Sequence, residues 1–255
     1  MTDFHALHYV LFFFTGLVAG TVDAIAGGGG LIMVPVLLAT GMPAPIVLGT
    51  NKLGAAFGTA SSAWWYDRQG AVSLGECRLG IAVTAIAAVG GAWTASRLPS
   101  DFLGHFIPWL LAAIVAFMVF RPTLGTASRE QKLKSGPFYL LFGPLLGFYD
   151  GFFGPGVGSF WTFAFVLLLG LNFVRASAHA RVMNFASNAS ALTVFALAGN
   201  VLLIPGLTLA AGQLIGGRIG ASLAVTRGAR FVRPIFLVMA GLTVLKLIYQ
   251  RYFQS

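Results

Sequence analysis

Long apolar runs, separated by short polar or glycine-rich breaks, make up almost the whole chain. This pattern predicts helices over residues 7–26, 31–40, 46–66, 79–96, 102–120, 138–150, 159–171, 176–198, 203–225 and 235–252. Many of these runs approach the roughly 20 residues that a helix needs to cross a bilayer. They lack the alternation of apolar and polar residues that marks the strands of a membrane barrel. We therefore predict an all-α integral membrane protein.

Two glycine-rich breaks interrupt the apolar pattern, and each follows an aspartate, Asp23 or Asp150. The residues that form the two breaks are Gly27, Gly28, Gly29 and Gly30 in the first and Gly154, Pro155 and Gly156 in the second. Backbone loosened by glycine inside hydrocarbon must find partners within the protein or line a wet cavity. Broken helices therefore predict a functional site where the breaks lie.

The second half of the chain follows the plan of the first. Overlaying the halves pairs Asp23 with Asp150 and, after a shift of two residues, Lys52 with Arg181. We predict a first membrane repeat at 1–122, a basic linker at 123–136 and a second repeat at 137–255. Each repeat has about four to five helices, including helices broken by glycine and proline. Repeats with breaks at corresponding positions are typical of secondary transporters.

The relative orientation of the two repeats depends on the short apolar piece at 31–40 and its counterpart at 159–171. If each piece only dips into the membrane, each half has four spans and the repeats are parallel. If each piece crosses, each half has five spans and the repeats are inverted. The sequence pattern leaves both arrangements open.

Composition supports the membrane assignment and limits the kinds of partner that the protein can bind. The chain is 57% hydrophobic and only 9% charged, whereas soluble proteins have about 25% charged residues. Its net charge of +9 comes from 16 Lys and Arg that are dispersed along loops and helix ends, without the basic face that nucleic-acid binding requires. The single cysteine excludes an intramolecular disulfide and offers no metal cluster. We expect membrane lipid and a small solute as partners, with no cofactor and no metal, and homo-oligomer formation stays open.

Four charged residues lie close to the breaks or to the turns that follow them. Asp23 and Asp150 could cap the backbone N–H groups freed at the breaks, or act as a proton relay or cation ligands. Lys52 and Arg181 each open a helix, where a cation opposes the helix dipole and needs a nearby anion. That anion could be the aspartate of the same half, Asp23 for Lys52 and Asp150 for Arg181, or an anionic substrate.

Arg218 lies within the predicted span 203–225, which contains no acid. An intramembrane guanidinium needs a partner, and its planar fork suits an oxyanion. We expect Arg218 to contact an anionic substrate, with Asp150 as the alternative partner.

Polar side chains near Lys52 and Arg181 complete the predicted site. Asn184 and Asn188 share a helix face by their spacing of four, and Asn51 precedes Lys52. Such residues either line a substrate path or join helices. His179 could sense pH or couple protons, or be structural. With Ser159 upstream, His179 would also allow a membrane hydrolase, but no nucleophile elbow surrounds that serine, so we expect no catalytic residue and no enzyme.

Five motifs in order resemble the sulfite exporter TauE/SafE family, in its YfcA-like branch. They are "DAIAGGGGLIMVP" (23–35), "GTNKLGAAFGT" (49–59), "GFYDGFFGPGVGSF" (147–160), "SAHARVMNFASN" (177–188) and "GQLIGGRIGA" (212–221). The resemblance implies a multi-pass protein of the bacterial inner membrane that moves small anions such as sulfite or organosulfonates, usually outward. Together with the repeats it predicts an exporter that works by alternating access. The alternatives are a cation carrier or channel that uses the aspartates, and a membrane scaffold that binds no solute.

Overall fold

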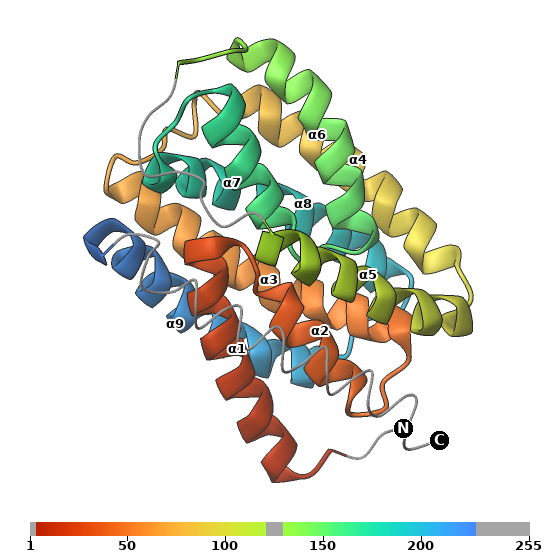
Figure 1. Cartoon of the computed structure of the whole chain (residues 1–255). Helices are drawn as coiled ribbons and strands as arrows, with labels where there is room; N and C mark the ends of the chain where they lie inside the picture. Colours follow the sequence, from red (N-terminus) through yellow and green to blue (C-terminus); the bar gives the residue numbers. More distant parts are fainter. Residues whose placement is uncertain (1–3, 121–129, 228–255) are drawn as a thin grey trace.

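The structure, a computed structural model, describes residues 4–120 and 130–227 (Figure 1). Within these ranges every regular element is an α-helix. The helices are α1 (Ala6–Ala26), α2 (Gly30–Leu38), α3 (Ala44–Arg68), α4 (Arg78–Arg97), α5 (Ser100–Phe120), α6 (Ser135–Phe152), α7 (Val157–Leu168), α8 (Phe173–Leu197) and α9 (Leu203–Arg227). Their bounds agree with the predicted helices to within about a turn. The helix predicted at 235–252 and residues 123–129 of the predicted linker lie outside the described residues.

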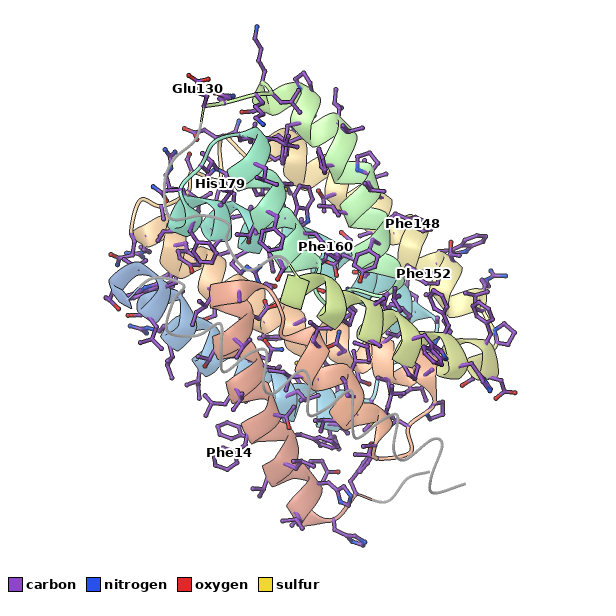
Figure 2. The ribbon with its side chains drawn as sticks, in the orientation of Figure 1. Phe14, Glu130, Phe148, Phe152, Phe160 and His179 are labelled. Carbon is purple, nitrogen blue, oxygen red and sulfur yellow. The ribbon has the colours of Figure 1, made fainter. Side chains whose placement is uncertain are left out.

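The bundle is apolar on the outside and polar in the middle. Large apolar side chains such as Phe14, Trp93 and Leu197 are exposed, and Figure 2 shows Phe14 projecting away from α1. Polar and charged residues buried on the two central helices are Thr50, Asn51, Lys52, Thr59 and Ser62 of α3, and Ser177, His179, Arg181, Asn184, Ser187 and Asn188 of α8. A soluble protein has the reverse arrangement, so this distribution agrees with a membrane-embedded bundle. By length and composition, α1 and α4 are the described helices that qualify as membrane spans.

Both short helices start at the glycine breaks. Gly27 ends α1 with a φ of 81°, and its N–H donates to the carbonyl of Asp23 at 2.8 Å. A Cβ added at Gly29 would lie 2.9 Å from the carbonyl oxygen of Ala19, so the chain turns back along the last turns of α1. With 9 residues in α2 and 12 in α7, these helices extend about 13 to 18 Å at 1.5 Å per residue. Neither reaches across the roughly 30 Å of a bilayer core.

Helices are exchanged between the two halves of the chain. The most extensive helix–helix interfaces join α1 to α9 and α4 to α6, and α9 also packs on α3 as α4 does on α8. Glycine permits the close approach: a Cβ at Gly16 or Gly20 would overlap the backbone of α9, and one at Gly147 or Gly151 that of α4. Small residues allow membrane helices to approach in this way. The fourth helix of each half therefore packs on the first and third helices of the other half.

Helices that correspond in the sequence overlay run in opposite directions. In Figure 1, α3 rises from lower right to upper left while α8 descends between the same ends, and α4 and α9 are opposed in the same way. The contacts agree, because Gly49 near the start of α3 approaches Asn200, which follows α8, and Lys52 reaches Asn188. Helices α2 and α7 are too short to cross the bilayer, yet corresponding helices of the two halves run in opposite directions. Short pieces that do not cross were expected with parallel repeats, and inverted repeats were expected with pieces that cross. The structure therefore matches neither expectation.

Candidate functional site

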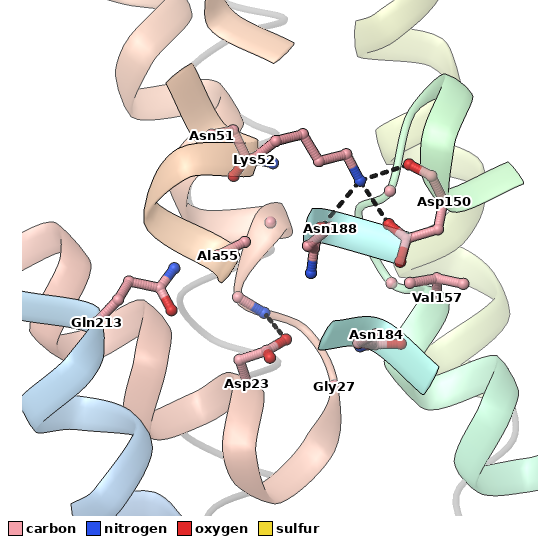
Figure 3. Close-up of a pocket in the computed structure, with 14 residues that line it drawn as sticks. Asp23, Gly27, Asn51, Lys52, Ala55, Asp150, Val157, Asn184, Asn188 and Gln213 are labelled. Carbon is pink, nitrogen blue, oxygen red and sulfur yellow. Dashed lines mark hydrogen bonds and ion pairs between the residues drawn. The ribbon is translucent and has the colours of Figure 1, made fainter. Parts of the chain in front are cut away.

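The two glycine breaks lie directly against each other. A methyl group on Gly27 would overlap the backbone of Gly158 and Ser159, and a Cβ at Gly30 would lie 3.0 Å from the Cα of Pro155. The hydroxyl of Ser159 donates to the carbonyl oxygen of Ala26. Residues more than a hundred positions apart thus form one centre between α3 and α8 (Figure 3).

Lys52 crosses this centre from α3 to reach the second break. Its Nζ lies 2.6 Å from Oδ1 of Asp150 and 2.5 Å from the main-chain oxygen of the same residue. The third contact is with Oδ1 of Asn188 at 3.1 Å. Both members of the pair are buried, with side-chain exposures of 1% and 2%. All three ammonium protons can therefore be used within the protein.

Arg181 makes the matching contact with the first break. Its Nη1 lies 2.6 Å from both Oδ2 and the main-chain oxygen of Asp23. The sequence had suggested pairs within each half, Lys52 with Asp23 and Arg181 with Asp150. That interpretation is wrong, because opposed α3 and α8 carry each cation to the break of the other half.

The two aspartates differ in their second contacts. Asp23 Oδ1 accepts the backbone N–H of Gly29 at 3.0 Å, so this carboxylate does cap a group freed at its break. Asp150 Oδ2 instead accepts the hydroxyl of Ser187. Asp23 and Asp150 thus hold the two cations, while the capping contact is found at Asp23.

The first turns of α2 and α7 both face the centre, since Gly29, Gly30, Gly156 and Val157 line the cavity there. The N-terminus of a helix carries a partial positive charge of about half a unit. Here the N–H groups of Leu31 and Val157 already donate to the carbonyls of Gly28 and Gly154. Two such ends and two buried cations therefore make the centre electropositive, balanced by the two aspartates.

The cavity is small and polar. Its volume, for the centres of water molecules, is about 20 Å³, and because holding one water takes about 10–15 Å³, it admits about one. Among the described residues, Oδ1 of Asn51, Oδ1 of Asn184 and Oε1 of Gln213 are buried without a hydrogen-bond partner. All three side chains line this cavity (Figure 3). A buried amide without a partner is costly, and each can turn over to offer either an acceptor or two donors.

Most of the residues predicted from sequence gather here. The predicted residues that line the cavity are Asp23, Gly27, Gly29, Gly30, Asn51, Lys52, Asp150, Gly154, Gly156, Asn184 and Asn188. Arg181 joins through its contact with Asp23, and Gly28 and Pro155 complete the two breaks.

The structure places Arg218 elsewhere. Its side chain is exposed on α9, and its Cζ lies 4.9 Å from the centre of the Trp65 ring. The partner of Arg218 is thus an aromatic face, as in cation–π pairs, and neither a cavity nor Asp150. The expected contact of Arg218 with a substrate has no support in this geometry.

His179 also lies away from the cavity. Its Nδ1 is 2.8 Å from the carbonyl of Arg175 and its ring centre 5.3 Å from that of Phe165. The hydroxyl of Ser159 is bound to Ala26. Ser159 and His179 therefore do not form the pair of nucleophile and base that a hydrolase requires.

Gln213 was not among the residues considered from sequence, whereas Ser187 shares the predicted polar face of Asn184 and Asn188. Gln213 lines the cavity and contacts the sulfur of Met33 through its amide nitrogen, and Ser187 binds Asp150. Gln213 stands between small residues in "AGQLIGG". A lone amide in an apolar span is the signal that would have found it.

Comparison with known proteins identifies the family of the chain. The family model for the sulfite exporter TauE/SafE matches residues 12–247. The chain is 38% identical over 243 residues to the probable membrane transporter protein YfcA of Escherichia coli K12, covering 95% of this chain and 90% of that protein. It is 40% identical over 241 residues to a probable membrane transporter protein of Haemophilus influenzae, covering 94% of each. No solved structure matches the chain. The chain belongs to the sulfite exporter TauE/SafE family, whose members are membrane transporters and not enzymes.

Proposed function

We propose that this protein is a secondary transporter that exports small anions such as sulfite or organosulfonates, across the inner membrane of a bacterium, by alternating access between two inverted repeats. The observation that carries the proposal is the convergence of two half-helix N-termini and the buried Lys52 on one cavity, with Arg181 held at its edge by Asp23. Half-helix N-termini that face the middle of a transporter are a recurring way of holding anionic groups.

In the described state the aspartates fill the place of the anion. Asp23 accepts the donors of Arg181 and Gly29, and Asp150 accepts those of Lys52 and Ser187. An oxyanion would use the same kinds of donor. Because the cavity admits about one water, an anion of four or more heavy atoms enters only if carboxylates move aside. Binding therefore opens the ion pairs that join the two halves.

The crossed ion pairs support alternating access. Each pair ties a long helix of one half to the break of the other, so both halves must shift when a pair opens. Exposure of the two acids already differs: the side chain of Asp23 is 15% exposed and that of Asp150 is 2% exposed. A structure with one pair nearer to water than the other fits a carrier that opens one side at a time.

Export of an anion needs no coupling ion in principle. An inside-negative potential drives an anion outward with about 2.3 kcal/mol per charge for each 100 mV. The cation alternative requires Asp23 and Asp150 to release their cations to a competing ion. It then leaves the two positive helix ends facing a positive charge, which their dipoles oppose.

The test combines ligand binding and flux on the purified protein. Thermal unfolding in detergent is followed with sulfite, thiosulfate, methanesulfonate, acetate, phosphate, Na⁺ and K⁺. A ligand at a hundred times its dissociation constant adds about 2.7 kcal/mol to stability. Flux of the stabilising anion is then measured in proteoliposomes.

The matched variants are Lys52→Gln, in the cavity, and Arg218→Gln, outside it. We expect stabilisation by one or a few oxyanions, with binding and flux lost in Lys52→Gln and kept in Arg218→Gln. Stabilisation by cations alone would favour the cation carrier, and no response to any solute would contradict the transporter proposed here.

A further inference from the structure

The two ion pairs are equivalent in the overlay of the halves, yet their acids differ in what remains when the cation leaves. Asp23 would keep the backbone N–H of Gly29, at the positive end of α2, and its side chain is 15% exposed. Asp150 would keep the hydroxyl of Ser187, in a position that is 2% exposed. The loss of its cation therefore affects Asp150 far more than Asp23.

A single atom must serve both Asp150 and the anion. The contacts of Lys52 with Asp150 and Asn188 all come from Nζ, so an oxyanion that binds this ammonium must displace one of its three acceptors. It also places a second negative charge beside the carboxylate of Asp150, which repels it. A carboxylate left buried with one neutral donor is strongly disfavoured. Taking up a proton removes the charge and turns the group into a donor.

Charges on the surrounding helices act on Asp150 in both directions, because Asp23 favours a proton there and the positive end of α7 opposes one. Asp23 faces Asp150 across the cavity as a like charge, and Arg181 is engaged with Asp23. The hydroxyl of Tyr149 donates to the carbonyl of Pro155. Arg78, Arg97 and Asp101 stand in the terminal turns of α4 and α5, and His105 lies in the second turn of α5. α7 carries no charged residue.

We propose that Asp150 takes up one proton each time an anion binds, so that the transporter moves an anion and a proton together. This rests on the proposed function, because it assigns the coupling ion of the same site. Lys52 changes partner from Asp150 to the anion, and the proton from water neutralises the freed carboxylate. A monovalent anion with one proton carries no net charge, so the membrane potential does not drive this coupled flux. Export then runs down the concentration gradient of the anion itself, and a pH gradient with the outside more acidic opposes it.

The first experiment counts protons per anion in proteoliposomes that hold a pH-sensitive dye. Methanesulfonate and thiosulfate are used because neither titrates near neutral pH, and sulfite is included with correction for its own protons. For the wild type we expect about one proton per anion. The flux of methanesulfonate should also change less than twofold when valinomycin and a K⁺ gradient impose a potential. A ratio near zero, or a flux that follows the potential, would overturn the proposal.

Two matched variants locate the proton. Asp150→Asn should lower the proton-to-anion ratio at least tenfold, whatever its rate, whereas Asp23→Asn should keep the ratio near one even if its rate falls. A ratio lost in Asp23→Asn and kept in Asp150→Asn would assign the proton to the other acid and contradict the proposal. If Asp150→Asn does not fold, the two wild-type measurements decide. Absence of flux for every anion defeats the proposed function itself, whereas anion flux without protons defeats only this inference.

Discussion

Lys52 and Asp150 are 98 residues apart in sequence, and the ammonium nitrogen of one lies 2.6 Å from the carboxylate of the other. The matching pair, Arg181 with Asp23, spans 158 residues. Neither cation pairs with the acid of its own half. The centre of the molecule is therefore held together by contacts between halves.

Breaking one crossed pair should destabilise the protein more than removing both of its members. We expect Asp23→Asn or Arg181→Gln alone to cost about 3–5 kcal/mol, because each leaves an uncompensated buried charge. The double variant should cost less than either single variant, because it leaves no unpaired buried charge. Reversible unfolding of the four proteins in mixed detergent measures this coupling. The control is the cycle that joins Arg181 to Asp150, which should be weaker, and a stronger coupling in that cycle would contradict the crossed arrangement.

Gly154 should not tolerate a side chain. Its φ is 100°, and a Cβ there would lie 2.7 Å from Nζ of Lys52 and 2.8 Å from Oδ1 of Asp150. Gly154→Ala should therefore strain the backbone by about 1–2 kcal/mol and also separate the ion pair. Thermal unfolding provides the measurement. Gly104→Ala is the matched control, because nothing lies within 4 Å of a Cβ at that position of α5, and equal losses in both variants would refute this account.

Arg218 should contribute to stability through its surface contact with Trp65 and should not be needed for transport. Replacing it with Gln removes a cation–π contact with Trp65, worth about 0.5–1 kcal/mol at an exposed site. We expect anion flux within about twofold of wild type and a change in tryptophan fluorescence. In proteins that carry Trp65→Leu, the Arg218→Gln substitution should no longer change the tryptophan fluorescence. Loss of flux in Arg218→Gln, with the fold intact, would restore the role expected from sequence.

Cys77 should resist thiol reagents in the folded protein. The residue is fully buried, burial raises the pKa of its thiol, and Tyr139 donates to its sulfur at 3.8 Å. A raised pKa leaves less thiolate at any given pH, and the thiolate is the reactive form. Maleimide labelling at pH 7.5 should therefore be at least tenfold slower in detergent than after unfolding in SDS.

The control for this labelling is a cysteine at an exposed position of the same loop. Ser73→Cys, introduced with Cys77→Ser, should react rapidly in both states because residue 73 is exposed. Fast labelling of Cys77 in folded protein would show that the loop opens freely.

Local features of the sequence were enough to predict the helices and the breaks. Helix ends follow the end of an apolar run or a glycine, and Gly27, Gly154 and Gly156 do adopt positive φ. These conformations depend on the glycine itself and on its near neighbours. The gathering of Lys52, Asp23 and Asp150 was also expected, because buried charges need partners.

The partners of the buried charges, and the side of each helix that faces the core, could not be predicted from local sequence. Arg218 illustrates the difficulty, since α9 has small residues on several sides and its sequence does not show which side faces the core. Gly212 and Gly216 pack on α1, Gly217 packs on α3, and Arg218 follows on the side left exposed. Pairing depends likewise on the opposed directions of α3 and α8, which follow from how both halves pack.

The exchange of helices between halves has a consequence for synthesis. α1 leaves the ribosome early, but its main partner, α9, begins at Leu203. At 5–20 residues per second, the delay is on the order of tens of seconds. During that time the glycine face of α1 has only lipid or a chaperone to cover it. A nascent chain that stops after α8 would keep this face open, and we expect quality-control proteases of the membrane to remove it.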